Sequence, residues 1–434
     1  MRVLWVTNFI PTMIAKTLGS YDNCKEGWIS GMLSKIVGDK ETAITLAIAS
    51  PVGANVQEGL ITEVKGIAFY GFHEGAPEIY DESLEKIFVQ IEKDFNPDII
   101  HVFGTEFPHT RAVTESIRKY GEVTKLTRDN VLIGMQGVVG EIADHYLDGV
   151  PVKVAKKKSL RDILKNDGME DQKFKFSMRS QNEIIALLGA GHVTGRTSFD
   201  KAYVTKWAFK SVYHFLNESL RDEFYEGEWD AGKADRHTIF LCQANYPVKG
   251  MHYVFEALPK IMEKYPDVKI RIAGDPITRH STLKEKLKLQ EYAKYLLKLE
   301  DEVAKKAGKA ADIKYLGTLS ASDIKEEYLK AGVFLCPSTI ENSPNSLGEA
   351  MLMGLPCVSA KVGGVADMIA DGEGFLYTAG DADGLAESIC KVFALSDADV
   401  TAMGKLGKER ALKTHDRENN YKTLLEIYKS MVKG

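Results

Sequence analysis

Short apolar runs alternate with helical stretches along the chain, and this alternation restricts the possible folds more than any other feature of the sequence. In the first half, apolar runs of strand length alternate with segments that have helical periodicity. We expect buried strands at residues 3–6, 43–49, 99–103 and 131–135, and helices at 29–37, 84–95 and 110–120. Such an alternation predicts a parallel sheet covered by helices on both faces.

The second half repeats the pattern, so the 434 residues are expected to form two doubly wound α/β domains. Strands are predicted at residues 238–243, 269–273, 314–316, 333–336 and 357–360, and helices at 252–265, 322–331 and 346–353. Residues 221–235 are polar, contain two glycines and lack periodicity, which indicates a linker. The expected domains are therefore 1–220 and 236–415, with a last helix in 416–434 that packs back on the first domain.

Composition excludes several classes of protein. The 56 basic and 61 acidic residues give a net charge of −5, which argues against a dedicated nucleic-acid binder. Five cysteines, none in a C-x-x-C pair, argue against a zinc site and favour a reducing compartment. The first apolar run is too short for a signal peptide, and no run approaches the roughly 20 residues of a membrane span. We therefore expect a cytoplasmic protein.

The segment 336–356 carries the densest chemical signal. A predicted strand ends at Cys336, a polar turn follows, and a helix is expected to begin near Asn345 or Ser346. The free N–H groups and the dipole at such a helix start favour an anion such as phosphate. Glu341 precedes the helix and Glu349 lies one turn inside it, so the two carboxylates can accept hydrogen bonds from two separate sets of hydroxyls.

This segment resembles glycosyltransferase family four. The resemblance consists of two glutamates eight positions apart, followed by Ala350-Met351 and by Gly354-Leu355-Pro356-Cys357-Val358. It extends over about residues 238–410 and is looser in the first half. It implies the GT-B fold, in which two Rossmann-like doubly wound domains face a central cleft. It also implies a metal-independent, hexosyltransferase-type enzyme without a cofactor, which transfers sugar from a nucleoside diphosphate donor with retention of anomeric configuration.

The resemblance also implies roles for residues of the second domain. Glu341 would face the donor sugar, Glu349 would hold the ribose hydroxyls, and the backbone of the helix start would cradle the diphosphate through Asn345, Ser346 and Leu347. Lys249, followed by Gly250, matches the family lysine that neutralises the diphosphate. Negative charge builds on this leaving group as its bond to the sugar breaks, so a nearby cation is needed.

The sequence departs from the family pattern in two places. Relatives commonly have an arginine five positions before the lysine, where this chain has Ala244. Arg196 either supplies that missing charge or pairs structurally with Asp200. Gln136 stands where many relatives place a histidine, and an amide orients a sugar hydroxyl but carries no proton.

Other candidates complete the expected site. Gln136 is grouped with Glu341 and Lys249 as catalytic, and the acceptor side is expected to include Gly27, Trp28 and His101. Two Asp-x-Asp pairs, at 381–383 and 397–399, resemble metal motifs, but each precedes a predicted helix and is better explained by N-capping. No metal is therefore expected.

The predicted activity is transfer of a sugar, from UDP in preference to GDP, to a hydroxyl of a glycan or lipid-linked acceptor in cell-surface polysaccharide synthesis. The leaving phosphate would accept the proton of the acceptor. Two alternatives are a nucleotide-sugar epimerase of the same fold and a non-catalytic nucleotide-sugar-binding protein. Gln136 and Glu341 are a poor acid–base pair for an epimerase.

Two further segments are amphipathic. Residues 152–165 contain six basic residues and one acidic residue, together with Leu160, Ile163 and Leu164. Assigned to the first domain, this segment is expected either to contact an anionic membrane through Lys156, Lys157 and Lys158, at the inner membrane face, or to form a solvated helix face. Residues 284–309 are expected to form one long, charged surface helix.

Overall fold

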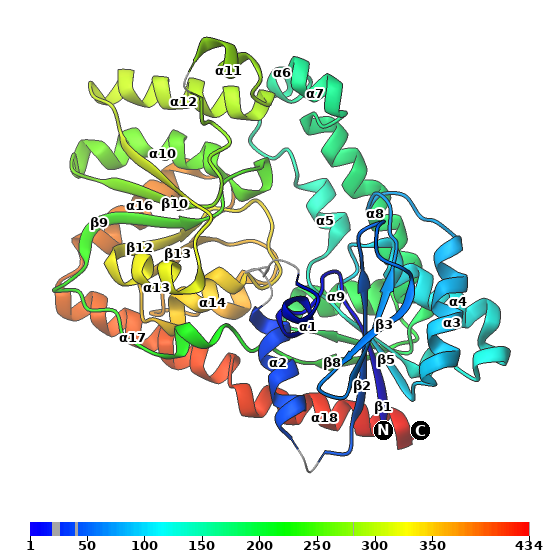
Figure 1. Ribbon diagram of the computed structural model, residues 1–434. Helices are drawn as coiled ribbons and strands as arrows, with labels where there is room; N and C mark the ends of the chain where they lie inside the picture. The colour runs from blue at the N-terminus through cyan, green and yellow to red at the C-terminus, as the bar shows by residue number, and fades with distance from the viewer. Residues whose placement is uncertain (20–26, 40–41, 281, 434) are drawn as a thin grey trace. The chain divides into compact units, whose positions relative to one another are not determined.

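The computed structural model describes residues 1–19, 27–39, 42–280 and 282–433, and the chain divides into two compact units. The first unit contains Met1–Gly140, Lys175–Leu220 and His415–Gly434, and the second contains Glu141–Phe174 and Arg221–Thr414. Each unit is built around one β-sheet (Figure 1). The division differs from the expected one because residues 141–174 and 221–235 belong to the second unit.

The sheet of the first unit has eight strands in the order β3-β4-β2-β1-β5-β6-β7-β8. All neighbours are parallel except β3 and β4, which pair antiparallel. The strands are β1 (Arg2–Val6), β2 (Thr45–Pro51), β3 (Gly59–Val64), β4 (Ile67–Phe72), β5 (Ile99–Phe103), β6 (Val131–Gly134), β7 (His192–Gly195) and β8 (Val212–Phe215). The four strands expected in this half are present as β1, β2, β5 and β6, and β3, β4, β7 and β8 are additional.

Helices cover both faces of this sheet, as the alternating pattern predicted. They are α1 (Thr12–Thr17), α2 (Gly27–Gly38), α3 (Ser83–Phe95), α4 (Pro108–Thr124), α9 (Ser198–Trp207), α18 (Arg417–Lys433) and the part of α8 (Met169–Gly189) that begins at Lys175. The chain leaves the unit within α5 (Val139–Asp144) and returns to it within α8. One core contains side chains of α3, α4 and α8, and the other contains side chains of α2 and the last helix α18. The indole N–H of Trp5 on β1 donates to the Tyr428 hydroxyl of α18 at 2.8 Å, so the end of the chain is fixed to the central strand.

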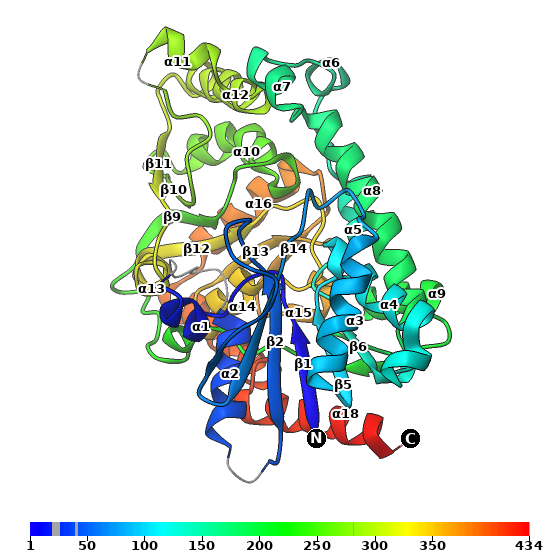
Figure 2. The same ribbon diagram turned by 45° about the vertical axis from the view of Figure 1, so that its right-hand side comes forward.

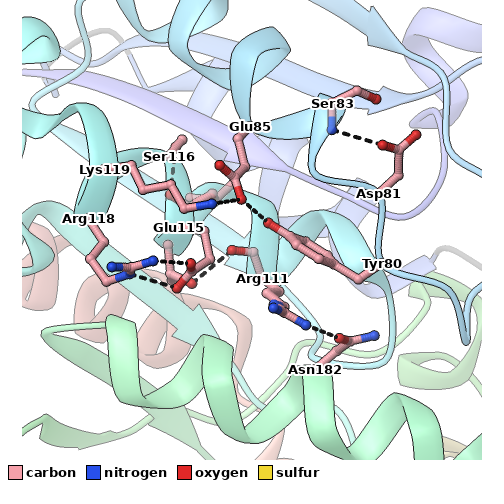
Figure 3. Close-up of polar contacts among 12 residues, drawn as sticks. Tyr80, Asp81, Ser83, Glu85, Arg111, Glu115, Ser116, Arg118, Lys119 and Asn182 are labelled. Atoms are coloured by element: carbon pink, nitrogen blue, oxygen red, sulfur yellow. Dashed lines mark hydrogen bonds and ion pairs between the residues drawn. The ribbon is translucent and has the colours of Figure 1, made fainter.

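A polar cluster joins α3 to α4 (Figure 3). The Glu85 carboxylate is buried and accepts hydrogen bonds from the Tyr80 hydroxyl at 2.6 Å and from the Lys119 ammonium at 2.8 Å. The Arg111 guanidinium stacks over the Tyr80 ring at 3.8 Å and donates to Asn182 of α8 at 2.9 Å. Burial and the adjacent carboxylate raise the pKa of Tyr80, so the hydroxyl stays protonated and keeps donating.

The sheet of the second unit has six parallel strands in the order β11-β10-β9-β12-β13-β14 (Figures 1 and 2). The strands are β9 (Asp235–Cys242), β10 (Lys269–Ala273), β11 (Asp312–Gly317), β12 (Ala331–Cys336), β13 (Cys357–Ala360) and β14 (Phe375–Tyr377). From β9 the chain proceeds to one edge of the sheet, and from β12 it proceeds to the other. In open α/β sheets, ligands bind beyond the carboxyl ends of the two strands at which the order reverses. The β9–β12 pair therefore marks the expected binding position in this unit.

The helices predicted for the second unit are present except in one segment, and α15 was not predicted. They are α6 (Val152–Ala155), α7 (Leu160–Lys165), α10 (Met251–Lys264), α11 (Leu283–Leu287), α12 (Glu291–Ala307), α13 (Ala321–Lys330), α14 (Asn345–Leu352), α15 (Val365–Met368), α16 (Ala382–Ala394) and α17 (Asp397–Thr414). The single helix expected over 284–309 is two helices, α11 and α12. In this segment Tyr292, Leu296 and Leu299 are buried, whereas Leu287 is exposed.

Residues 221–235 are packed against the second sheet rather than forming a linker. Phe224 is fully buried and contacts the Tyr328 ring edge-on at 5.6 Å. The Trp229 indole N–H donates to the Ala331 carbonyl of β12 at 2.7 Å. The segment is mostly polar and lacks periodicity, so the sequence did not reveal that Phe224 and Trp229 are buried. Their burial attaches the segment to the second unit.

Candidate functional site

Two loops meet at the carboxyl ends of β9 and β12. The loop after β9 ends in a short 3₁₀ turn (Pro247–Lys249), and the loop after β12 leads through Glu341 to α14. The Lys249 ammonium donates to Glu341 Oε1 at 2.6 Å, and the Ser338 hydroxyl donates to the same oxygen at 2.7 Å. The structure thus brings together two of the three residues expected to be catalytic, at the strand reversal of the second sheet.

Lys249 is poised to bind an anion. Burial lowers the pKa of this ammonium, but the adjacent Glu341 carboxylate has the opposite effect, and the net pKa lies above its usual range. Lys249 is therefore charged at neutral pH. An ammonium has three N–H donors, so the contact with Glu341 leaves capacity for phosphate oxygens.

Glycines fix the backbone around this ion pair. Gly250, directly after Lys249, has a φ of +69°, and a Cβ added there would lie 1.9 Å from the carbonyl oxygen of Pro337. Only glycine permits this close approach of the two loops. A Cβ on Gly363 would lie 2.0 Å from the Glu341 carbonyl oxygen, which accepts the Gly364 N–H at 3.1 Å. Gly250 thus supports the site by letting the two loops lie close together, rather than by contacting a ligand through a side chain.

Helix α14 begins at Asn345, as the sequence predicted. The Leu347 N–H donates to the Pro344 carbonyl at 3.0 Å, so it belongs to the hydrogen-bonded first turn of the helix. The N–H groups of Asn345 and Ser346 precede that bond and lie where helix starts bind anions. Of the three residues expected to cradle a diphosphate, Asn345 and Ser346 therefore fit better than Leu347.

Glu349 is held by an arginine that the sequence analysis missed. Its buried carboxylate accepts hydrogen bonds from Nε and Nη2 of Arg221, both at 2.8 Å. Burial raises the pKa of Glu349, and Arg221 opposes this effect. Arg221 lies in the segment expected to be a linker, and no local motif marks it. The two partners are 128 residues apart, so the sequence alone did not show that they form a pair.

Three expected residues of the first unit line one small cavity. His101, Gln136 and Arg196 surround a space of about 40 Å³ at the carboxyl ends of β5 to β8. Gly27 and Trp28 begin α2, and their side chains lie outside the described part of the chain.

His101 does not act as a titrating group at neutral pH. Its side chain is buried, its Nδ1 lies 2.7 Å from the Tyr428 hydroxyl, and its ring stacks on Phe103. Burial lowers the pKa of His101 to about 3, so the ring is neutral. The residue expected on the acceptor side is thus a core side chain fixed by α18, although it is also among the residues that line the cavity.

Arg196 differs from both expectations. Its Nη1 lies 2.7 Å from Glu218 Oε2, and its Nη2 donates to the Gln136 carbonyl at 2.7 Å. Only its backbone N–H contacts Asp200, at 2.8 Å. Because Glu218 compensates its charge, Arg196 positions the backbone of Gln136 and does not present a free cation in place of the arginine missing at Ala244.

A second missed residue, Glu183 on α8, supports the loop that carries Gln136. Its buried carboxylate accepts hydrogen bonds from the Thr105 hydroxyl at 2.5 Å and from the N–H groups of Val139 and Gly140 at 3.0 and 3.4 Å. Burial raises the pKa of Glu183 to about 7, and these donors counteract part of that effect. Glu183 is one of many acidic residues in a helix, and nothing in the local sequence marks it as buried.

The two Asp-x-Asp pairs occupy helix starts. Asp381 accepts the Gly384 N–H at 2.9 Å and caps α16, as predicted. Asp397 pairs with Arg236 at 2.6 Å. Among the described residues, no three His, Cys, Asp or Glu side chains are grouped as metal ligands. No helix within the described ranges is long and apolar enough to span a bilayer.

Residues 228–410 match the family model described as "Glycosyl transferases group 1". The chain is 27% identical over 191 residues to D-inositol 3-phosphate glycosyltransferase of Corynebacterium urealyticum. That match covers 42% of this chain and 41% of the relative, so it spans less than half of the relative's length.

Two solved structures share the fold over nearly the whole chain. Sucrose-phosphate synthase of Thermosynechococcus elongatus is 14% identical with a TM-score of 0.66, covering 99% of this chain and 98% of that chain. Anabaena Alr3699/HepE, in complex with UDP and glucose, is 16% identical with a TM-score of 0.63, covering 99% of this chain and 100% of that chain. The two Rossmann-like units therefore have the GT-B fold. Residues 228–410, which contain Lys249, Glu341 and Glu349, are similar to the group 1 glycosyl transferases.

Proposed function

We propose that this chain is a retaining glycosyltransferase that moves a sugar from a nucleoside diphosphate sugar to a hydroxyl of a glycan or lipid-linked acceptor. The Lys249–Glu341 pair at the β9–β12 strand reversal carries the proposal. A cation beside a helix start suits a diphosphate, and a carboxylate beside it suits sugar hydroxyls.

The donor would bind along the second unit. Its diphosphate contacts Lys249 and the N–H groups of Asn345 and Ser346, and its sugar hydroxyls donate to Glu341. The ribose hydroxyls donate to Glu349, whose oxygens keep accepting capacity beyond the two bonds from Arg221. UDP is the proposed nucleotide, because HepE, a protein with this fold, was solved with UDP and glucose.

The proposed reaction needs no protein nucleophile. The bond between the anomeric carbon and the phosphate oxygen breaks, and the acceptor oxygen bonds to the same face of that carbon. The acceptor proton passes to an oxygen of the departing phosphate. Lys249 stabilises the charge that builds on this phosphate, which is the step at which a fixed cation contributes most. Gln136 orients a hydroxyl, and Arg196 and Glu183 fix the loop that carries it.

The proposed acceptor is a glycan or lipid-linked precursor of cell-surface polysaccharide, met at the inner face of the membrane. The exposed basic and aliphatic surface of α6, α7 and α11, described below, supports an acceptor of this kind.

Transfer can be tested by following free nucleoside diphosphate. With a UDP-sugar and a panel of glycan, polyol phosphate and lipid-linked acceptors, UDP should be released only when an acceptor is present, and excess chelator should not prevent release. Conversion of the donor into an isomeric nucleotide sugar without an acceptor would instead identify an epimerase. Donor binding without any turnover would identify a non-catalytic binding protein.

A further inference from the structure

Aliphatic side chains are exposed at one end of the second unit, where α6 and α7 lie beside α11 and α12 (Figures 1 and 2). Their exposed fractions range from 62% to 83%, and they are Val152, Leu160, Ile163, Leu164, Leu283 and Leu287. We call these six residues and the lysines around them the lysine–leucine surface. It lies in the second unit, whereas the sequence analysis had assigned residues 152–165 to the first domain.

Helix α7 exposes its apolar side chains and buries an acidic one, unlike a helix that only covers a core. Leu160, Ile163 and Leu164 lie three and four positions apart and therefore share one face, which points to solvent. The acidic residue Asp162 is buried and exchanges capping hydrogen bonds with Ser159 at 3.0 and 3.1 Å. A surface helix normally buries its leucines and exposes its acids.

Asp162 also fixes α7 to the neighbouring helix. Its Oδ2 accepts the N–H of Glu291, the first residue of α12, at 2.9 Å. On the other side of that junction, α11 presents Leu283 and Leu287, four positions apart, to solvent. The exposed faces of α7 and α11 therefore lie on helices that are both joined to the start of α12: α7 by this hydrogen bond and α11 by the chain.

The surface is basic within an acidic protein. Basic residues exceed acidic ones by five between 152 and 165 and by two between 283 and 288, whereas the whole chain has a net charge of −5. Lys157 and Lys158 pair with Glu291 at 2.5 Å and Asp171 at 2.7 Å, so two of the three lysines expected to contact a membrane have partners within the unit. The exposed lysines around the leucines include Lys153, Lys156, Lys165, Lys284 and Lys288.

We propose that the lysine–leucine surface docks the protein on an anionic lipid leaflet. The aliphatic side chains enter the boundary between headgroups and acyl chains, and the lysines contact anionic headgroups. A second copy of the chain fits less well, because a two-fold axis would bring the same lysines against each other. The proposal extends that of a lipid-linked acceptor, but its test involves no transfer step.

Co-sedimentation with vesicles tests the proposal. The protein should sediment with vesicles of phosphatidylcholine and phosphatidylglycerol, but not with phosphatidylcholine alone, and high salt should release it. The triple variant Lys153→Ser, Lys156→Ser, Leu164→Ser should bind at least about 20-fold more weakly, since each lysine near an anionic surface contributes about fivefold. A matched control is Lys405→Ser, Leu412→Ser, Lys413→Ser on α17, which removes the same three residue types from another exposed helix.

The control should bind like the wild type, and both variants should melt at the wild-type temperature. Three results would overturn the proposal: wild-type protein that stays in the supernatant, equal losses in the two triple variants, or a wild-type dimer that only the first variant dissociates. UDP-dependent thermal stabilisation should persist in both variants, so failure of docking is distinguishable from failure of the proposed transferase function.

Discussion

Replacing Lys249 with alanine should lower kcat by at least about 100-fold and change donor affinity much less. The ammonium lies 2.6 Å from Glu341 at the strand reversal, and its charge is needed most when the leaving phosphate gains negative charge. An interaction that strengthens in the transition state affects kcat more than substrate binding. Steady-state kcat and KM for the nucleotide sugar, together with the donor dissociation constant, measure this split.

A matched control for this variant is Lys260→Ala. Lys260 lies on α10, the helix that follows Lys249, and pairs with Glu387 at 3.1 Å. Removing it deletes an ion-paired lysine without touching the site, so kcat should be unchanged. Wild-type turnover in Lys249→Ala, or equal losses in the two variants, would refute the role given to Lys249.

Replacing Glu349 with alanine should weaken donor binding at least about 100-fold, and this effect should exceed the effect on kcat. Two charge-assisted hydrogen bonds to ribose hydroxyls would be lost, each contributing about 1.5–3 kcal/mol. The same change leaves the Arg221 guanidinium buried without its partner, which typically costs about 3–5 kcal/mol of stability. Binding and stability must therefore be measured separately.

The double variant Arg221→Met, Glu349→Ala separates the two effects. It removes the buried cation as well, so stability should recover relative to Glu349→Ala, whereas donor affinity should remain low. Calorimetric titration with UDP and urea unfolding measure the two quantities. A donor dissociation constant that is unchanged in Glu349→Ala, or that recovers in the double variant, would reject the ribose assignment.

Local sequence was sufficient where the structure depends on neighbours in the chain. The segments Ile99–Phe103, Lys269–Ala273 and Cys357–Ala360 are strands with the predicted bounds. The first and the last are buried along their whole length, which is typical of parallel strands covered on both faces. Glu341 and Glu349 were identified with the start of α14 between them because all three lie within nine positions.

Long-range pairs explain most of what the sequence analysis did not predict. Arg221 and Glu349 are 128 residues apart, and each is an ordinary charged residue in its own segment. His101 was expected to contact the acceptor, but the structure places its ring against Tyr428, which is 327 residues away in the chain. A side chain's availability depends on the partner that buries it, and local composition does not reveal that partner.

The assignment of residues 152–165 failed for a related reason. Position in the sequence suggested the first domain, but Asp162 and Lys157 tie this segment to Glu291 at the start of α12. The chain thus enters the second unit at Glu141, returns to the first, and enters the second again at Arg221. Hydrophobic periodicity predicts helices and strands, but it does not show that the chain passes between the two units in this way.

A crystal structure of the protein with UDP tests the central claim most directly, because that claim is the position of the donor. The diphosphate should lie within about 3 Å of the Lys249 ammonium and of the N–H groups of Asn345 and Ser346, which is the ordinary hydrogen-bond distance. The ribose hydroxyls should donate to Glu349. Diphosphate density away from Lys249 and the start of α14, for example in the first-unit cavity lined by Gln136, would contradict the account.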